Sequence, residues 1–405
     1  MLQTGGNVKL GMSDHSNVPA PELVRKCNGL EDILLTSGLQ GFYGELNTNY
    51  WDWKETKINI AVVGRSGAGK STFINNFLHL EENGEEEAAT GVIEMTKIPK
   101  SYRSKHCLNV IFWDLPGIGS PSFNKQSYIN DTSLGRYDYF LILSRKRFTT
   151  YDAWLAEYVK DSGRKFYFVR THIEEDLDND KDSHPRTHIP EKVIADIRKY
   201  CEESLAKQGL EGQNVFLVDN FDPDKHDFFL LTEKMLDDAG EFKACILASC
   251  IASTTTRVIE LKTKVLKKRI KNTAQRCGLL YHKNTKVAMN VFNSECELYR
   301  KVFEIDESNI RVDKNIFQLP ESDIIKKVKY LDGIDLWTKL GLHIVLMLMH
   351  IILKREHDDQ VIELVDDQVI ELVLNDYLER LRVMAIELYA NMSTEVSRNV
   401  HEVSR

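Results

Sequence analysis

The feature that most constrains the fold is a glycine-rich segment, GRSGAGKST, at residues 64–72. It follows an apolar run, INIAVVG at 58–64, and opens a stretch of helical character over Lys70–His79. The pattern G-x-x-x-x-G-K-[ST] between a strand and a helix predicts a loop whose backbone N–H groups surround phosphate oxygens. Glycine suits these positions because a side chain would clash with the phosphate.

Two side chains of this segment have predicted roles of their own. Lys70 places a positive charge on the β- and γ-phosphates, and Ser71 offers its hydroxyl to Mg²⁺. The helix that starts here adds the partial positive charge of its N-terminus. The sequence therefore predicts a site for a nucleoside phosphate and its magnesium ion.

A second motif, DLPG at 114–117, ends the apolar run NVIFWD. In this D-x-x-G form, Asp114 is predicted to hold Mg²⁺ through a water, and Gly117 to donate its N–H to the γ-phosphate. The form favours the GTPase branch of the P-loop proteins. Small GTPases carry a Gln after this glycine that orients the attacking water, and Ile118 cannot do so. We expect hydrolysis by the isolated domain to be slow or to depend on a partner's residues.

The switch that completes the Mg²⁺ site is expected between these motifs, in EENGEEEAATGVIEMTK at 81–97. Thr90, which precedes Gly91, is the predicted threonine ligand, and Thr96 is the alternative. The acidic run at 85–87 is predicted to be a solvated loop.

The base-reading motif of GTPases, N/T-K-x-D, is altered to THIE at 171–174. Guanine presents two adjacent hydrogen-bond donors, N1–H and the 2-amino group, and a carboxylate accepts a hydrogen bond from each. Adenine presents an acceptor at N1, which a carboxylate repels. Glu174 keeps the carboxylate with one more methylene, so a guanine preference is expected, with His172 at the base edge. The next element, usually Ser-Ala or Ser-Asn, is Asp219-Asn220. An ATP-dependent P-loop enzyme stays open as an alternative that rests on Glu174 alone.

Apolar runs alternate with helical stretches after Lys57. The predicted strands are 58–64, 109–114, 139–144, 165–171 and 215–220, and the predicted helices between them are Lys70–His79, Thr150–Ser162 and Pro190–Lys207. Apolar strands separated by helices are typical of a mostly parallel sheet covered by helices. The expected fold class is α/β.

The strand signal fades after about residue 238, where amphipathic helices follow. One of them, RVIELKTKVLKKRIK at 257–271, has an apolar face and a lysine-rich face. We predict that the lysine-rich face is solvated, with contact to anionic lipid as the alternative. The expected parts are an N-terminal segment, partly disordered and partly helical (1–56), a P-loop GTPase domain (57–238) and a helical domain (239–405).

Bulk composition excludes several classes of protein. A net charge of −8 argues against a general nucleic-acid binder, which needs clustered Lys and Arg. The seven cysteines form no C-x-x-C pair, so reduced thiols are expected rather than a zinc site or a disulfide framework.

The N-terminus has neither an apolar signal core nor a myristoylation motif, so a cytoplasmic protein is expected. The apolar segment LGLHIVLMLMHIIL at 340–353 spans about 21 Å as a helix, short of the roughly 30 Å hydrocarbon core. A buried core helix is predicted there, with interfacial membrane contact as the alternative.

With these residues identified, the chain resembles the immunity-related GTPases, the IRG family of interferon-inducible, dynamin-like GTPases. The resemblance rests on INIAVVGRSGAGKSTFIN, ATGVIEMTK, NVIFWDLPGIGSPSF, YDYFLILSRKRF and KFYFVRT. It implies a GTPase domain joined to a helical domain built from the N- and C-terminal segments.

The resemblance also implies function. It implies GTP hydrolysis with Mg²⁺, homo- or hetero-oligomers in which GTPase domains face each other, and peripheral action at intracellular membranes or vacuoles in cell-autonomous immunity. Glu94 matches a switch position linked to assembly-dependent hydrolysis. The nucleotide contacts that carry over are Gly67, Gly69, Lys70, Ser71, Thr72, Thr90 and Gly91. A hydrolysis-poor regulatory relative that acts through other GTPases is the alternative, which the altered base reader and Ile118 favour.

Overall fold

The computed structural model describes parts of one compact unit that runs from Trp51 to Arg405. The described residues are 52–78, 80, 98–104, 107–119, 123–222, 225–251, 253, 255–281, 285–305 and 368–386. Outside these ranges lie the predicted switch residues Thr90, Gly91, Glu94 and Thr96, the apolar segment 340–353 and the N-terminal segment up to residue 51.

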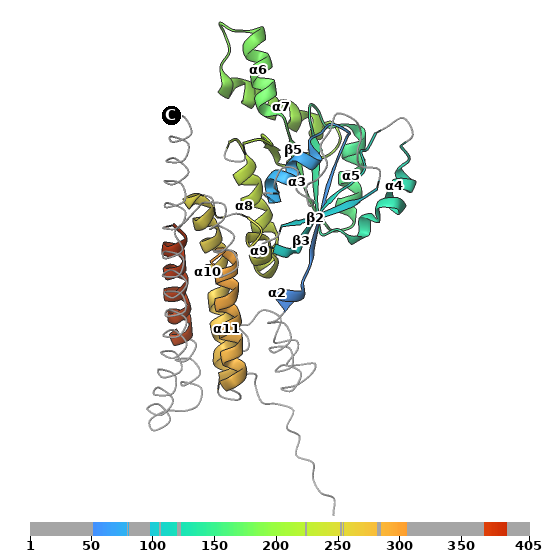
Figure 1. The fold of residues 1–405 in the computed structure, drawn as a ribbon. Coiled ribbons are helices and arrows are strands. Elements are labelled where there is room, and N and C mark those ends of the chain that lie inside the picture. The colour runs from blue at the N-terminus through green and yellow to red at the C-terminus, as the bar shows by residue number, and fades with distance from the viewer. Residues whose placement is uncertain are drawn as a thin grey trace, which may run out of the picture. The chain divides into compact units, whose positions relative to one another are not determined.

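A six-stranded sheet is formed within residues 58–217, in the order β2-β3-β1-β4-β5-β6 (Figure 1). Five strands are parallel: β1 (Ile58–Gly64), β3 (Cys107–Asp114), β4 (Tyr139–Ser144), β5 (Lys165–Arg170) and β6 (Val215–Leu217). Their residues are mostly buried, as the continuous apolar runs predict for a sheet with both faces covered. The predicted α/β class with a mostly parallel sheet is confirmed.

Two details of the sheet differ from the sequence-based expectation. An additional edge strand, β2 (Lys100–Ser104), pairs antiparallel with β3. Its sequence, KSYRS, lacks an apolar run because an antiparallel edge strand can face water. The strand predicted over 215–220 ends at Leu217, so Asp219 and Asn220 belong to the loop that follows β6.

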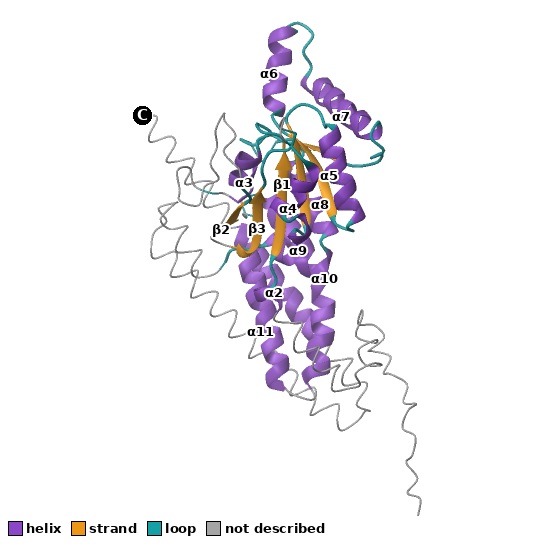
Figure 2. Ribbon diagram, turned by 90° about the vertical axis from the view of Figure 1, so that its right-hand side faces the viewer, coloured by secondary structure: helices purple, strands orange, loops and turns teal. Residues whose placement is uncertain are grey.

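Helices cover both faces of the sheet (Figures 1 and 2). The predicted ones are present as α3 (Lys70–Leu78), α5 (Thr150–Asp161) and α7 (Pro190–Ala206), and the structure adds α2 (Asp52–Glu55), α4 (Lys125–Thr132) and α6 (Ile173–Ser183). Helix α6 was not predicted because its sequence, IEEDLDNDKDS, buries only Ile173 and Leu177. It follows the carboxyl end of β5 and begins within the altered base-reading motif, so Ile173 and Glu174 belong to its first turn.

After β6, every secondary-structure element that the structure describes is a helix. Its elements are α8 (Phe228–Asp238), α9 (Gly240–Ala248), α10 (Thr256–Tyr281), α11 (Thr285–Val302) and a helix over 368–386. Helix α9 contacts β1 and β3 on one side and α10 and α11 on the other, so it joins the sheet to the helices. The indole N–H of Trp53 adds a second link, because it donates to Ser294 Oγ of α11 at 3.1 Å.

The lysine-rich face predicted on 257–271 is largely engaged in ion pairs. Lys262 is fully buried, and its Nζ donates to Val302 O at 2.7 Å and to Glu304 Oε1 at 2.9 Å. Arg269 is also buried and forms a bidentate pair with Glu295, at 3.0 and 2.9 Å. The prediction of a solvated face is therefore wrong for these two residues, because their partners on α11 and in the turn after it were not visible in the sequence.

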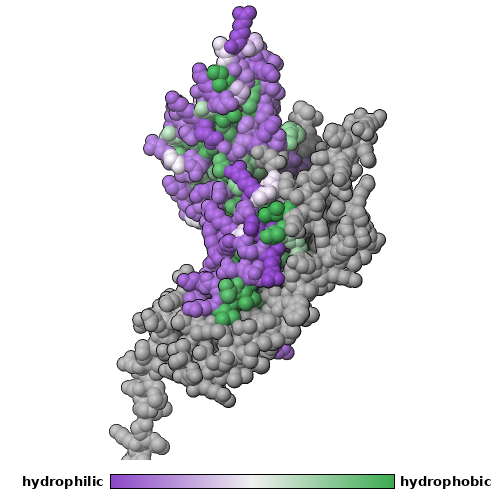
Figure 3. All heavy atoms as spheres, turned by 90° about the vertical axis from the view of Figure 1, so that its left-hand side faces the viewer, coloured by the Kyte–Doolittle hydropathy of each residue, from purple (hydrophilic) through white to green (hydrophobic). Residues whose placement is uncertain are grey.

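Three exposed lysines of this face, Lys264, Lys267 and Lys268, pair with Glu233, Glu379 and Asp237 respectively. None of the described helices is long and apolar enough to cross a membrane. On the face drawn in Figure 3, the described surface is mainly hydrophilic, with small hydrophobic patches.

The buried pair yields a stability prediction. We expect Glu295→Ala to lower the free energy of unfolding by roughly 3–5 kcal/mol, because it leaves Arg269 buried without its carboxylate. Asp237→Ala, which removes an exposed pair with Lys268, is the matched control and should cost about 1 kcal/mol or less. Urea unfolding followed by circular dichroism measures both. Equal losses of unfolding free energy in the two variants would contradict the conclusion that the Arg269–Glu295 pair is buried and the Lys268–Asp237 pair exposed.

Candidate functional site

The phosphate loop lies between the end of β1 and the start of α3, as the motif predicts. Gly67 and Gly69 both have φ of +77°, a backbone conformation that L side chains rarely adopt. A Cβ on Gly69 would lie 2.5 Å from Asn220 Nδ2 and 3.2 Å from His172 Cε1. Glycine is therefore required at 69 by the backbone conformation and by the two side chains that close on it.

The predicted metal ligands Ser71 and Asp114 are in contact. The Ser71 hydroxyl donates to Asp114 Oδ2 at 2.7 Å, and Asp114 is 1% exposed at the end of β3. The parallel pairing of β1 with β3, in which Val62 lies opposite Asp114, brings the two together. Lys70, which starts α3, is also largely buried.

This donor set fits Mg²⁺. The cation prefers oxygen ligands and is usually bound by one or two protein groups together with substrate phosphates and waters. The hydroxyl of Ser71 and the carboxylate of Asp114 are such groups. The described residues contain no cluster of three or more His, Cys, Asp or Glu that would hold a metal without a phosphate. Thr90, the third expected ligand, lies outside the described residues.

The segment after Asp114 returns along the phosphate loop. The N–H of Ile118 donates to Gly64 O at 3.2 Å, and Gly117 lies beside the loop. The Ile118 side chain is 2% exposed and belongs to the hydrophobic core. The position at which small GTPases carry a water-orienting Gln therefore carries a packing residue.

His172 and Thr171 join the altered base reader to the phosphate loop. The Thr171 hydroxyl donates to Ala68 O at 3.0 Å and lies 2.8 Å from His172 Nδ1. His172 precedes α6 with a φ of +62°. Burial, with a smaller contribution from Arg145, lowers the pKa of His172, so the ring is neutral at pH 7.

Glu174 lies in the first turn of α6 and has protein partners. Its Oε1 is 2.9 Å from His226 Nε2 and 3.8 Å from Lys225 Nζ. The side chain is 36% exposed, so the carboxylate still reaches solvent. The sequence did not predict these partners, because they belong to the loop after β6 and only the fold brings them to α6.

Asp219 and Asn220 are buried in the same loop. Asn220 Nδ2 donates to Gly69 O at 2.9 Å, and Asp219 Oδ1 accepts the N–H of Phe221 at 2.6 Å. Since Asn220 and His172 both approach Gly69, the two base-reading elements meet at the end of the phosphate loop.

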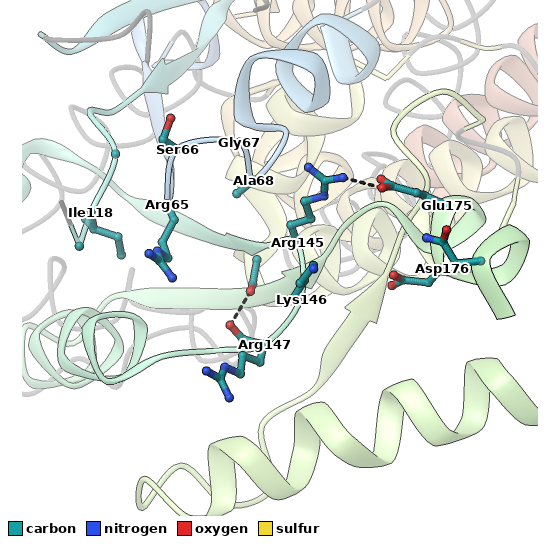
Figure 4. Close-up of a pocket in the computed structure, with 14 residues that line it drawn as sticks. Arg65, Ser66, Gly67, Ala68, Ile118, Arg145, Lys146, Arg147, Glu175 and Asp176 are labelled. Atoms are coloured by element: carbon teal, nitrogen blue, oxygen red, sulfur yellow. Dashed lines mark hydrogen bonds and ion pairs between the residues drawn. The ribbon is translucent and has the colours of Figure 1, made fainter. Parts of the chain in front are cut away.

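A cavity of about 700 Å³ lies on another side of the phosphate loop (Figure 4). Its basic lining residues are Arg65, Arg145, Lys146 and Arg147. Arg145 pairs with Glu175 at 2.5 Å, as Figure 4 shows. Asp176 also lines the cavity and pairs with Arg170, so the four basic residues outnumber the two carboxylates. Such a cavity suits an anionic group. Sequence analysis missed it because the run 145–147 meets Arg65 only in the folded chain.

Comparison of the sequence with known proteins identifies the family. The family model described as "Interferon-inducible GTPase (IIGP)" matches residues 28–338. The mouse protein "Interferon-gamma-inducible GTPase 10" is 34% identical over 68% of this chain and 65% of its own length. The mouse "T-cell-specific guanine nucleotide triphosphate-binding protein 2" is 35% identical over 64% of this chain and 63% of its own length. The chain therefore spans less than two thirds of the length of these relatives.

Solved structures with a related fold are more distant. Era in complex with MgGDPNP and ribosomal RNA is 17% identical, with a TM-score of 0.30 over 45% of this chain and 57% of that one. Toc33 from Arabidopsis thaliana in complex with GDP and Mg²⁺ is 14% identical, with a TM-score of 0.30 over 49% of this chain and 81% of that one. At these scores the likeness adds nothing to the fold described above. The family match covers well over half of the chain, and the chain belongs to the interferon-inducible GTPases, the immunity-related GTPase family.

Proposed function

We propose that this protein binds GTP with Mg²⁺ and hydrolyses it to GDP and phosphate. The contact between Ser71 and Asp114, 2.7 Å apart beside the buried Lys70, is the observation that carries the proposal. These are the three side chains that phosphoryl transfer on a P-loop requires for charge neutralisation and metal binding. Ser71, Asp114 and Thr90 would hold Mg²⁺, and the ion would supply positive charge to neutralise the phosphates.

The roles of the protein's own residues follow from their positions. Lys70 holds the β- and γ-phosphates, and the N–H groups of the loop and of Gly117 orient them. Gly67, Gly69 and Thr72 complete the phosphate contacts. Glu174 accepts from the guanine edge through its solvent-facing side, with His172, Asp219 and Asn220 around the base.

Catalysis is proposed to need a second copy. Among the described residues near the phosphate loop, Ile118 is buried and cannot orient water, so the activating groups come from the switch with Thr90 and Glu94 and from a facing GTPase domain. The basic cavity beside the loop supports this, since it offers positive charge at the surface where a facing copy would meet the phosphates. Self-assembly of this kind at intracellular membranes, as part of cell-autonomous immune defence, is the proposed cellular role.

A second candidate function is a hydrolysis-poor regulatory module that binds nucleotide and acts through other GTPases. The engagement of Glu174 with His226 and Lys225 favours it, together with the buried Ile118. Both functions share the phosphate site and differ in turnover.

The phosphate site gives the first of two predictions about the nucleotide. Lys70→Ala should weaken GTP and GDP affinity by at least about thirtyfold, because about 2 kcal/mol or more is lost when one partner of a buried charge pair is removed. Lys165→Ala is the matched control, since Lys165 is exposed at the amino end of β5 and should leave affinity unchanged. Isothermal calorimetry measures both. Unchanged affinity in Lys70→Ala would contradict the proposed site.

Turnover gives the second prediction. GTP hydrolysis per molecule should rise with protein concentration, because activating groups come from a facing copy, and should be absent in Lys70→Ala at every concentration. Phosphate release measured over a wide range of protein concentration tests this. Rapid turnover that is independent of concentration would contradict dimer-assisted catalysis. Negligible turnover at all concentrations, with nucleotide bound, would support the regulatory module instead.

A further inference from the structure

The loop after β6 presents an aromatic ring to solvent beside the base-reading residues. Of the large apolar residues that the structure describes, Phe221 is the most exposed, at 83%. It directly follows Asn220, which is buried against the phosphate loop. No described residue of the chain covers the Phe221 ring.

The described residues at the two ends of this loop are joined to each other. Asp227 Oδ2 accepts the N–H of Leu217 at 2.8 Å and a guanidinium N–H of Arg198 at 2.7 Å. The N–H of Asp227 in turn donates to Leu217 O at 2.8 Å. Residues 217 and 227 are therefore fixed together, and α8 begins directly afterwards at Phe228.

The loop is also fixed to the nucleotide site at two points. On one side of Phe221, Asn220 Nδ2 donates to Gly69 O of the phosphate loop. On the other side, His226 Nε2 contacts Glu174 Oε1 of the base reader. The backbone of Phe221 is held as well, since its N–H donates to Asp219 Oδ1 at 2.6 Å. The exposed Phe221 therefore lies in a segment whose described residues on both sides contact the phosphate loop and the altered base reader.

We propose that Phe221 stacks on the purine base of the bound nucleotide and so supplies affinity that does not depend on base identity. The proposal rests on the proposed function, because it needs a nucleotide in the phosphate loop. An aromatic ring has a favourable stacking energy with any base, since every base has a π-face. Hydrogen bonds to Glu174 distinguish bases by their edge, whereas Phe221 contacts the face of the base.

This division of roles accounts for the altered base reader. One carboxylate oxygen of Glu174 already contacts His226 and Lys225, so it has less capacity for the guanine edge than an unengaged aspartate. A stacking ring compensates for part of that loss in affinity, although not in selectivity. We therefore expect this protein to retain nucleotide affinity with a narrower preference for guanine over hypoxanthine, whose nucleotide lacks the 2-amino donor.

The test compares three variants on two nucleotides by calorimetry, with GDP and inosine diphosphate in Mg²⁺ buffer. Phe221→Ala should weaken both nucleotides by the same factor, roughly 5- to 150-fold, which corresponds to one stacked base. Phe221→Trp should restore affinity for both. Glu174→Ala should instead change the ratio of GDP to inosine diphosphate affinity, because it removes an edge contact.

Controls separate the possible causes of failure. Tyr200→Ala removes another exposed aromatic residue, on α7, and should leave both affinities unchanged. If wild-type protein binds no nucleotide, the proposed function fails, and the stacking role fails with it. If wild-type protein binds GDP and Phe221→Ala binds it equally well, the proposed function stands and the stacking role is overturned. Unchanged affinity with weakened self-association of Phe221→Ala would likewise overturn it, and would make the ring a contact between copies.

Discussion

The parallel pairing of β1 with β3 is the constraint on which the site depends. It places Val62 opposite Asp114, so the strand that leads into the phosphate loop ends beside the strand that carries the acidic residue. Ser71, one residue into α3, then reaches Asp114 Oδ2 at 2.7 Å. Because the carboxyl ends of parallel strands lie at one edge of the sheet, the loops after β4, β5 and β6 gather at the same edge.

Two groups of residues at that edge have different origins. The phosphate side is formed by a short, continuous motif and one strand end, so its chemistry follows from local sequence. The base side is formed by the loops after β5 and β6, which meet at Gly69 through His172 and Asn220. The pairing of Glu174 with His226 ties those loops together across 52 residues of the chain, so the proposed base site depends on tertiary contacts.

The sequence predicts most of the sheet because buried parallel strands are continuous apolar runs. It does not predict β2, whose polar sequence suits a solvated edge, or α6, which has only two buried apolar side chains. It places Ser71 and Asp114 in one site through motif spacing, and the structure brings them together. Lys262 and Arg269 show what hydrophobic periodicity cannot predict. Both are basic residues on a helix face that the pattern assigns to solvent, and both are buried because their partners come from elsewhere in the fold. His226 and the basic cavity at Arg65 depend on tertiary contacts that local sequence does not encode.

The central claim is that this edge of the sheet is a guanine nucleotide site that keeps its preference for guanine over adenine through Glu174. The most direct measurement is the affinity of the wild-type protein for GTP, GDP and ATP with Mg²⁺, determined by calorimetry. The account predicts micromolar binding of GTP and GDP and at least about tenfold weaker binding of ATP, a difference of about 1.4 kcal/mol. Equal affinity for all three, or no binding, would contradict it and would mean that the altered motif no longer reads the base.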